Sequence, residues 1–253
     1  MTIFSSVMWN VDPTFITLFG LEIRYYGVFW ALAFIAGIYF FTNFTKREKL
    51  PDRLVDSLFW YATILGILGA RLGHCLFYEP EIYLANPLRI LNIREGGMAS
   101  HGAAIGMLLG MWITARKHNM PYVWWLDRIM IPVSIGGGLV RFGNLCNSEI
   151  VGSVTDVPWG FKFVRLYNLP LSDVPVQHPA QLYEAICYFI TFGILMWFYY
   201  KKDVARKRAG VMFGIGLLGI FLTRFFIEII KKDQEAFEAD MLLNMGQLLS
   251  LPF

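Results

Sequence analysis

The distribution of apolar and polar residues divides this chain into long hydrophobic runs separated by short polar segments. Several runs approach the roughly 20 residues that a helix needs to cross a bilayer. The pattern therefore predicts an all-α, polytopic integral membrane protein with about six transmembrane helices. We place these spans at residues 27–44, 54–78, 98–115, 124–145, 178–200 and 209–230.

The segments between the runs predict the rest of the organisation. Residues 1–23 alternate apolar and polar positions, and we expect them to lie along the membrane interface. Residues 79–97 combine prolines with aromatic residues, which suits an interfacial elbow. Residues 147–177 are polar and contain prolines, so we expect a small extramembrane, periplasmic subdomain there. We treat residues 1–253 as a single transmembrane domain.

Composition supports the membrane assignment. The chain is 56% hydrophobic and 16% charged, whereas soluble domains average about 25% charged residues. A net charge of +3 gives no indication of nucleic-acid binding. The three cysteines are isolated and no two histidines have ligand spacing, so we expect neither a disulfide framework nor a metal site. We also expect no cofactor.

The positions of the basic residues predict how the chain is oriented in the membrane. Lysines and arginines concentrate after the first, third and fifth spans, which makes those loops cytoplasmic and puts the N-terminus outside. In this orientation the polar residues of all six spans fall in the outer half of the bilayer. We therefore expect one polar cavity that opens outward. Its expected members are Tyr26, Arg71, His74, His101, Arg141, Asn144, His178, Gln181, Glu184, Arg224 and Glu228.

The stretch at residues 134–152, SIGGGLVRFGNLCNSEIVG, is the strongest candidate for a site. Placing Arg141 at membrane depth costs about 2.5–3.5 kcal/mol, so a partner or a function is expected for it. Asn144, Asn147 and Glu149 follow closely, and the glycines at 136–138 allow another backbone or a ligand to approach. The alternative is that Arg141 merely extends toward the outer headgroups.

The remaining candidates each have a structural alternative. Arg224 could pair with Glu228 four residues later, but two arginines at one level also suit a phosphate. His101 could be a packing residue. Its small neighbours would leave room for a substrate, however, and imidazole titrates near neutral pH. Tyr26 could belong to an aromatic belt, and Arg71 could serve packing.

Seven motifs together resemble the prolipoprotein diacylglyceryl transferases of bacterial inner membranes. They are IRYYG (23–27), GARLGH (69–74), EGGMASHGAAIG (95–106), GGLVRFGNLCNSEIVG (137–152), HPAQLYEA (178–185), RFFIE (224–228) and MGQLLSLP (245–252). The resemblance covers nearly the whole chain in the family's order. It implies a seventh membrane helix beyond Phe253, so we expect either that this sequence is truncated or that the last helix is missing here.

The resemblance also implies roles for individual residues. Catalytic roles fall on Tyr26, His101, Arg141 and Arg224. The residues implied to bind phosphatidylglycerol are Arg141, Asn144, Glu149 and Gly152, and we add Arg71 and Glu228. Three positions depart from the family pattern: Ala103 narrows the space beside His101, Ser148 stands where glycine is common, and Ile220 stands where some relatives have tyrosine.

The implied reaction transfers the diacylglyceryl group of phosphatidylglycerol to the lipobox cysteine of a preprolipoprotein, with glycerol phosphate leaving. Its partners would be that lipid, the signal-peptide region and the bilayer, and its location would be the bacterial inner membrane. Two other classes remain open on the residues alone. One is a transporter of a small anion or lipid, although repeated halves are not visible. The other is a membrane scaffold.

Overall fold

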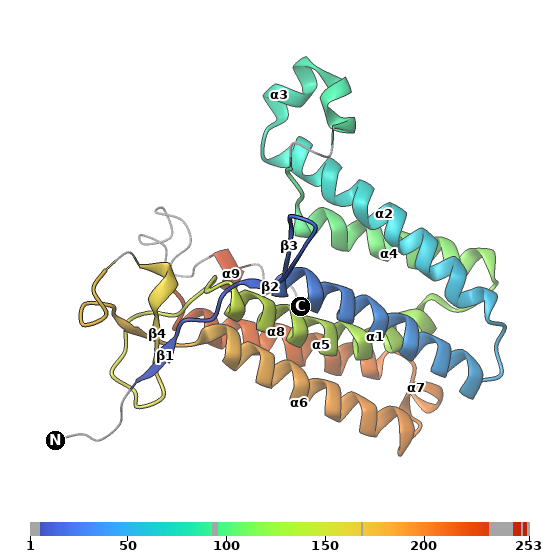
Figure 1. Cartoon of the computed structure of the whole chain (residues 1–253). Coiled ribbons are helices and arrows are strands. Elements are labelled where there is room, and N and C mark those ends of the chain that lie inside the picture. Colours follow the sequence, from blue (N-terminus) through green and yellow to red (C-terminus); the bar gives the residue numbers. More distant parts are fainter. Residues whose placement is uncertain (1–5, 93–95, 168, 233–244, 249, 252–253) are drawn as a thin grey trace. The chain divides into compact units, whose positions relative to one another are not determined.

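The computed structural model describes residues 6–92, 96–167, 169–232, 245–248 and 250–251. Glu95, Leu249 and Pro252, which belong to two of the motifs, lie outside these residues. The chain forms two compact units (Figure 1). The first contains Met1–Gly37 and Asp127–Phe253, and we call it the α5 unit. The second, Ile38–Leu126, is called the α2–α4 unit.

The described chain is mostly helical, as predicted. Five helices are long and apolar enough to cross a membrane: α1 (Tyr25–Arg47), α2 (Arg53–Phe77), α5 (Tyr122–Cys146), α6 (Ala180–Tyr200) and α8 (Val211–Glu228). The predicted span at 98–115 forms an 18-residue helix, α4 (Ser100–Lys117), which is not among those five. The count of six spans therefore stays a prediction.

The shorter helices lie in the connecting segments. The predicted elbow at 79–97 contains α3 (Pro80–Ala85) and the 3-10 helix η1 (Pro87–Leu91). The others are η3 (Val164–Leu166), α7 (Val204–Lys207) and α9 (Met245–Leu248).

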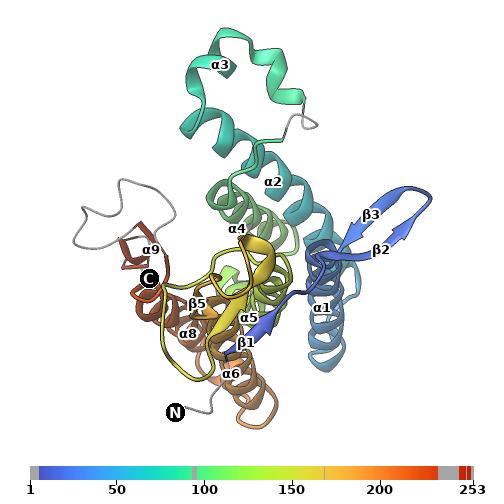
Figure 2. The same cartoon turned by 60° about the vertical axis from the view of Figure 1, so that its left-hand side comes forward.

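Strands are the part of the α5 unit that the sequence did not predict. β1 (Val7–Trp9) pairs in parallel with β4 (Phe161–Phe163), and β4 pairs antiparallel with β5 (Val176–Gln177). β2 (Thr14–Leu18) and β3 (Leu21–Arg24) form a separate hairpin, visible in Figure 2. The segment expected to be a small extramembrane subdomain therefore has a sheet. Leu145, Val151, Phe161 and Phe163 form a buried core beneath it.

In the α2–α4 unit, two helices pack backbone to backbone through glycines. A Cβ on Gly69 would clash with the main chain of Gly102, and one on Gly110 would lie 2.7 Å from the Tyr61 carbonyl oxygen. Small residues permit such close approach of membrane helices. The space beside Gly102 and Gly106, which follow His101, is therefore occupied by the main chain of α2. This corrects the expectation that they leave room for a substrate.

The α5 helix packs closely on its neighbours within its own unit. A Cβ on Gly136 would lie 3.2 Å from Ala33 of α1, and one on Gly137 would lie 3.1 Å from Tyr188 of α6. α8 joins the same bundle (Figure 1), because Gly216 faces Met130 of α5. The three consecutive glycines thus allow close approach of neighbouring helices, as expected.

Candidate functional site

Arg141 lies near the C-terminal end of α5 and pairs with a buried carboxylate. Its Nε contacts Glu184 Oε2 on α6, and its Nη1 donates to Asn144 Oδ1 at 3.2 Å. The Arg141 side chain is only 15% exposed, and Glu184 is fully buried. Arg141 therefore directs its charge at another helix, which disfavours the alternative of simple extension toward headgroups.

Glu184 continues this pair into a chain of charged groups. Lys231, which follows α8, places its Nζ 2.6 Å from Glu184 Oε1 and 2.9 Å from Glu228 Oε2. Arg224 Nε is 4.0 Å from the same Glu228 oxygen. Glu228 thus has a closer partner in Lys231 than in Arg224, so the predicted i,i+4 pair is its weaker one.

The charges in this network do not balance. Among the described residues it joins three cations, Arg141, Arg224 and Lys231, to two carboxylates, Glu184 and Glu228. With all five groups ionised, the formal charge is +1. Arg224 has a 35% exposed side chain, and its buried Nε has no hydrogen-bond partner among the described residues. Arg224 is therefore the cation of the network with capacity to receive an anion.

A second hydrogen-bonded group begins where α5 ends. Asn144 donates from Nδ2 to Glu149 Oε2 at 3.2 Å, and Asn147 donates from Nδ2 to Oε1 at 3.1 Å. Gln181 of α6 donates to the Glu149 main-chain oxygen. These bonds connect Glu149 through Asn144 to Arg141. Between them, Ser148 has a φ of 55°, in the left-handed region that favours glycine.

Tyr26 and Gly152 lie against this region through backbone contacts. A Cβ on Gly143 of α5 would lie 2.9 Å from the Tyr26 ring. The Gly152 N–H donates to the His178 oxygen at 2.8 Å, and the Gly152 oxygen accepts from Gln177 Nε2 at 2.9 Å. A Cβ on Gly152 would lie 2.7 Å from the His178 oxygen. The requirement for glycine here is explained by packing.

Arg71 has a different environment from the one we predicted. All five of its N–H donors are directed at main-chain carbonyls: Nε at Ile90 (2.8 Å), Nη1 at Gly96 (2.5 Å) and Gly97 (3.2 Å), and Nη2 at Arg89 (2.8 Å) and Asn92 (3.1 Å). A guanidinium has only five such donors. Arg71 therefore anchors the segment between α2 and α4, and we do not retain it among the lipid-binding residues.

His101 lies in the first turn of α4, so it belongs to the α2–α4 unit, whereas Arg141 and Arg224 belong to the α5 unit. Its side chain is exposed, and no hydrogen bond or ion pair joins it to the residues that the structure describes. The single cavity formed by all six spans stays a prediction. Within the α5 unit, the structure does bring together Tyr26, Arg141, Asn144, Glu149, Arg224 and Glu228 with their immediate partners.

Sequence reasoning missed Lys231, and it placed Glu184 in the polar cavity without predicting its ion pairs with Arg141 and Lys231. Lys231 stands at the start of the charged segment after α8, where a lysine usually marks a loop. Its spacing of three residues from Glu228 was the only available signal. Among the described residues, no group of three His, Cys, Asp or Glu side chains could hold a metal ion.

Comparison with known proteins identifies the family. The family described as prolipoprotein diacylglyceryl transferase matches residues 13–253. A phosphatidylglycerol–prolipoprotein diacylglyceryl transferase from Porphyromonas gingivalis is 44% identical, covering 100% of this chain and 93% of the relative. The proteins of that name from Chloroherpeton thalassium and Tolumonas auensis are 43% and 42% identical, each over 98% of this chain and over 90% and 93% of their own lengths. The chain therefore belongs to the prolipoprotein diacylglyceryl transferase family.

Proposed function

We propose that this protein transfers the diacylglyceryl group of phosphatidylglycerol to the lipobox cysteine of preprolipoproteins. The relatives carry the name of this activity. The observation on this chain that carries the proposal is Arg224, whose buried Nε has no hydrogen-bond partner among the described residues. It belongs to an ion-paired network of three cations and two carboxylates, in which Glu149 is not counted because it reaches Arg141 only through the neutral Asn144. A phosphodiester has a single negative charge, which would balance the network when the lipid headgroup binds.

The phosphate would be held from two sides. Arg224 offers its unsatisfied Nε donor, and Arg141 is fixed in orientation by Glu184 and Asn144. Planar guanidinium groups bind phosphate oxygens bidentately. In this arrangement Lys231 and the two glutamates position the arginines, and Glu149 holds Asn144. Glu228 then acts through Lys231 and Arg224 on the headgroup.

The reaction breaks the bond between the glyceryl carbon and the phosphate oxygen. The thiolate of the acceptor cysteine attacks that carbon and forms the thioether, and the electron pair of the broken bond leaves with glycerol phosphate. The leaving group gains one negative charge, which fixed cations stabilise most when water is excluded. The arginines would therefore contribute more in the transition state than when substrate first binds.

The thiol must lose its proton, because the thiolate is the nucleophile. Arginine stays protonated and cannot take it. We assign this task to His101, because histidine is the most common general base in enzymes and its exposed side chain has no hydrogen-bond or ion-pair partner among the described residues. Tyr26 packs on Gly143, near Arg141 in the chain, and we propose that it has a catalytic role together with Arg141.

The protein is a multi-pass protein of the bacterial inner membrane, and we propose that its N-terminus and active site face outward. The support is the concentration of basic residues after α1, α4 and α6. In this orientation residues 147–177 are periplasmic. Both substrates reside in the membrane, so we expect them to enter laterally between helices.

The test is a mass-shift assay with the whole chain in phosphatidylglycerol liposomes and a peptide that contains a lipobox cysteine. We expect the peptide to gain a diacylglyceryl group while one glycerol phosphate is released for each peptide modified. Arg224→Gln and His101→Gln should each abolish most turnover. Arg165→Gln, which removes an exposed arginine paired with Asp12 at 3.0 Å, is the matched control and should retain it.

Two results would overturn these proposals. Flux of an anion or lipid into sealed vesicles, without a mass shift on the peptide, would indicate a transporter. Near-normal transfer by His101→Gln would remove its assignment as the base and leave the reaction itself standing.

A further inference from the structure

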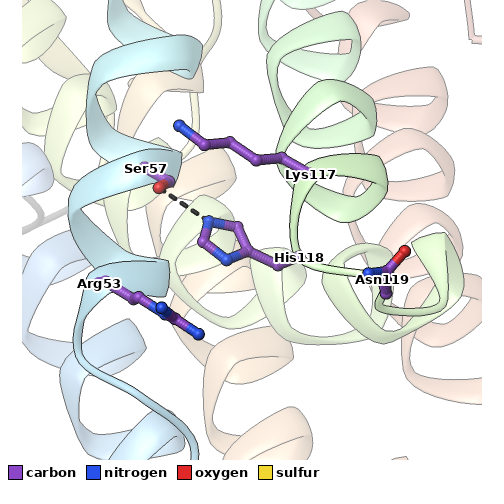
Figure 3. Close-up of a pocket in the computed structure, with 5 residues that line it drawn as sticks. All are labelled: Arg53, Ser57, Lys117, His118 and Asn119. Carbon is purple, nitrogen blue, oxygen red and sulfur yellow. Dashed lines mark hydrogen bonds between the residues drawn. The ribbon is translucent and has the colours of Figure 1, made fainter.

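A basic pocket lies within the α2–α4 unit, where α2 begins and α4 ends (Figure 3). Arg53, Ser57, Lys117, His118 and Asn119 line a space of about 410 Å³. His101 is in the first turn of α4, whereas Lys117 is its last residue. At 1.5 Å per residue, these two residues are separated by roughly 24 Å along the helix. The pocket is therefore at the helix end opposite the proposed base.

Contacts with α2 hold two of the pocket's side chains, those of Lys117 and His118. The ring nitrogen Nε2 of His118 lies 2.8 Å from the Ser57 hydroxyl, as drawn in Figure 3. Lys117 donates to the Tyr61 hydroxyl at 3.3 Å, and its Nζ lies 5.2 Å from the centre of the Tyr61 ring. Side chains held in this way lose less conformational freedom when they bind a ligand.

The electrostatics of the pocket favour an anion. The backbone dipole of α2 is positive at its N-terminus, where Arg53 is the first helical residue. Partial burial, followed by the positive charges of Arg53 and Lys117, holds the pKa of His118 below its usual value. Asp52 and Asp56 are on the same turn of α2, but both are exposed and neither lines the pocket. The lining groups carry positive charge without a carboxylate.

The surroundings suit a ligand at a membrane surface. Trp60 lies one turn along α2 from Ser57 and is 61% exposed, which offers apolar surface to an acyl chain. Basic pockets between membrane helices on the cytoplasmic side bind anionic headgroups. Under the proposed orientation, this end of α2 and α4 faces the cytoplasm.

We propose that this pocket binds a phosphate group, carried by an anionic phospholipid or free in the aqueous phase. Arg53 and Lys117 would contact the phosphate oxygens, and His118, held by Ser57, would donate a third hydrogen bond. The site is separate from the transfer reaction, since none of its residues belongs to the proposed catalytic set. The proposed site would place an anionic ligand at the end of the α2–α4 helix pair opposite His101.

The experiment follows the imidazole resonances of His118 by NMR in the whole chain, without an acceptor peptide. One arm uses phosphatidylcholine nanodiscs with added inorganic phosphate. The other uses nanodiscs that contain a minor fraction of phosphatidic acid and no free phosphate. Comparison with His118→Gln assigns the signal. We expect a saturable shift and a rise in the pKa of His118 in at least one arm, and the arm that responds identifies the source of the phosphate.

A matched pair of variants tests the site itself. Lys117→Gln should weaken binding about fivefold, since one basic residue near the surface contributes about 1 kcal/mol, and Lys117→Arg should restore it. Arg116→Gln removes the same charge one residue earlier, from a side chain that lies over Trp112 and does not line the pocket. The affinity of the Arg116→Gln variant for phosphate should stay close to that of the unchanged chain. Equal weakening by both Gln variants, or the lack of a saturable shift in both arms, would overturn the proposal, whatever the outcome of the transfer assay.

Discussion

Arg141 and Arg71 are two arginines on apolar helices with opposite kinds of surroundings. Arg71 directs every donor at a neutral main-chain carbonyl and thereby fixes the segment that joins α2 to α4. Arg141 meets a buried carboxylate, which is shared with Lys231 and connected through Glu228 to Arg224. The carbonyls around Arg71 accept from all of its donors, so no donor is left for a ligand. The network around Arg141 contains a donor, Arg224 Nε, that has no hydrogen-bond partner among the described residues and that a ligand could use. The neighbours of an arginine therefore distinguish a structural role from a binding role.

The two units are also held together differently. The α2–α4 unit relies on glycines that bring main chains into contact. The α5 unit also has close glycine contacts, and it adds charged side chains that reach between α5, α6 and the end of α8. The first kind of packing is sensitive to added volume, and the second is sensitive to the loss of a single charge.

The largest effect is expected from Glu184→Gln. This change leaves Arg141 and Lys231 buried without their shared carboxylate, and breaking a buried ion pair from one side costs about 3–5 kcal/mol. We expect the free energy of unfolding, measured by denaturation in mixed micelles, to fall by that amount.

Glu79→Gln serves as the control. Glu79 lies 3.3 Å from His74, but its side chain is 45% exposed, so the loss should stay below about 1 kcal/mol. Equal losses in the two variants would mean that the α5 network is not stabilised in the way described.

Gly106→Ala should disrupt the close packing of α4 on α2, which we call the glycine contact of the α2–α4 unit. The added methyl group would clash with the Leu65 carbonyl, and overpacking of this kind costs about 1–3 kcal/mol. The same denaturation measurement should show the decrease. Gly193→Ala in α6 places its methyl group where nothing lies within 4 Å, so it should not destabilise the protein. A comparable loss of stability in this variant would contradict the role given to the glycine contact of the α2–α4 unit.

The smallest effect on stability is expected at Asp12, which belongs neither to the ion-paired network nor to the glycine contact of the α2–α4 unit. A hydrogen bond from the Thr14 N–H at 2.8 Å, together with Arg165, holds the pKa of Asp12 below its usual value. A carboxyl whose pKa is lowered by folding stabilises the protein above its unfolded-state pKa, and this contribution disappears as the pH falls through the lowered value. The difference in melting temperature between the unchanged chain and Asp12→Asn should therefore be present at neutral pH and vanish in acid. A difference that grew in acid would reverse the assigned sign.

The sequence was sufficient for the helical membrane architecture, because apolar runs and basic loops follow directly from the properties of the bilayer. It also indicated Arg141, Asn144 and Glu149 as one group, since they are close in the chain. The ion pairs of Glu184 with Arg141 and with Lys231 could not be predicted, because they join three segments far apart in sequence. Strands β1, β4 and β5 were missed because they have two or three residues each, too few for a period to be visible. β2 and β3 lie largely within the alternating segment at residues 1–23, which we assigned to the membrane interface. For Arg71 the sequence left packing and lipid binding open, because nothing in it indicates that main-chain carbonyls surround this side chain.

The most direct test of the account compares Arg141→Gln with Arg71→Gln in the transfer assay, with each rate divided by the amount of folded protein. The loss of Arg141 should lower the rate of diacylglyceryl transfer by roughly 100- to 1,000-fold, the usual cost of removing one group that stabilises developing charge. Arg71→Gln should destabilise the α2–α4 unit but leave the rate per folded molecule close to that of the unchanged chain. Equal losses of rate in the two variants, or full turnover by Arg141→Gln, would contradict the assignment of the buried network to the lipid phosphate.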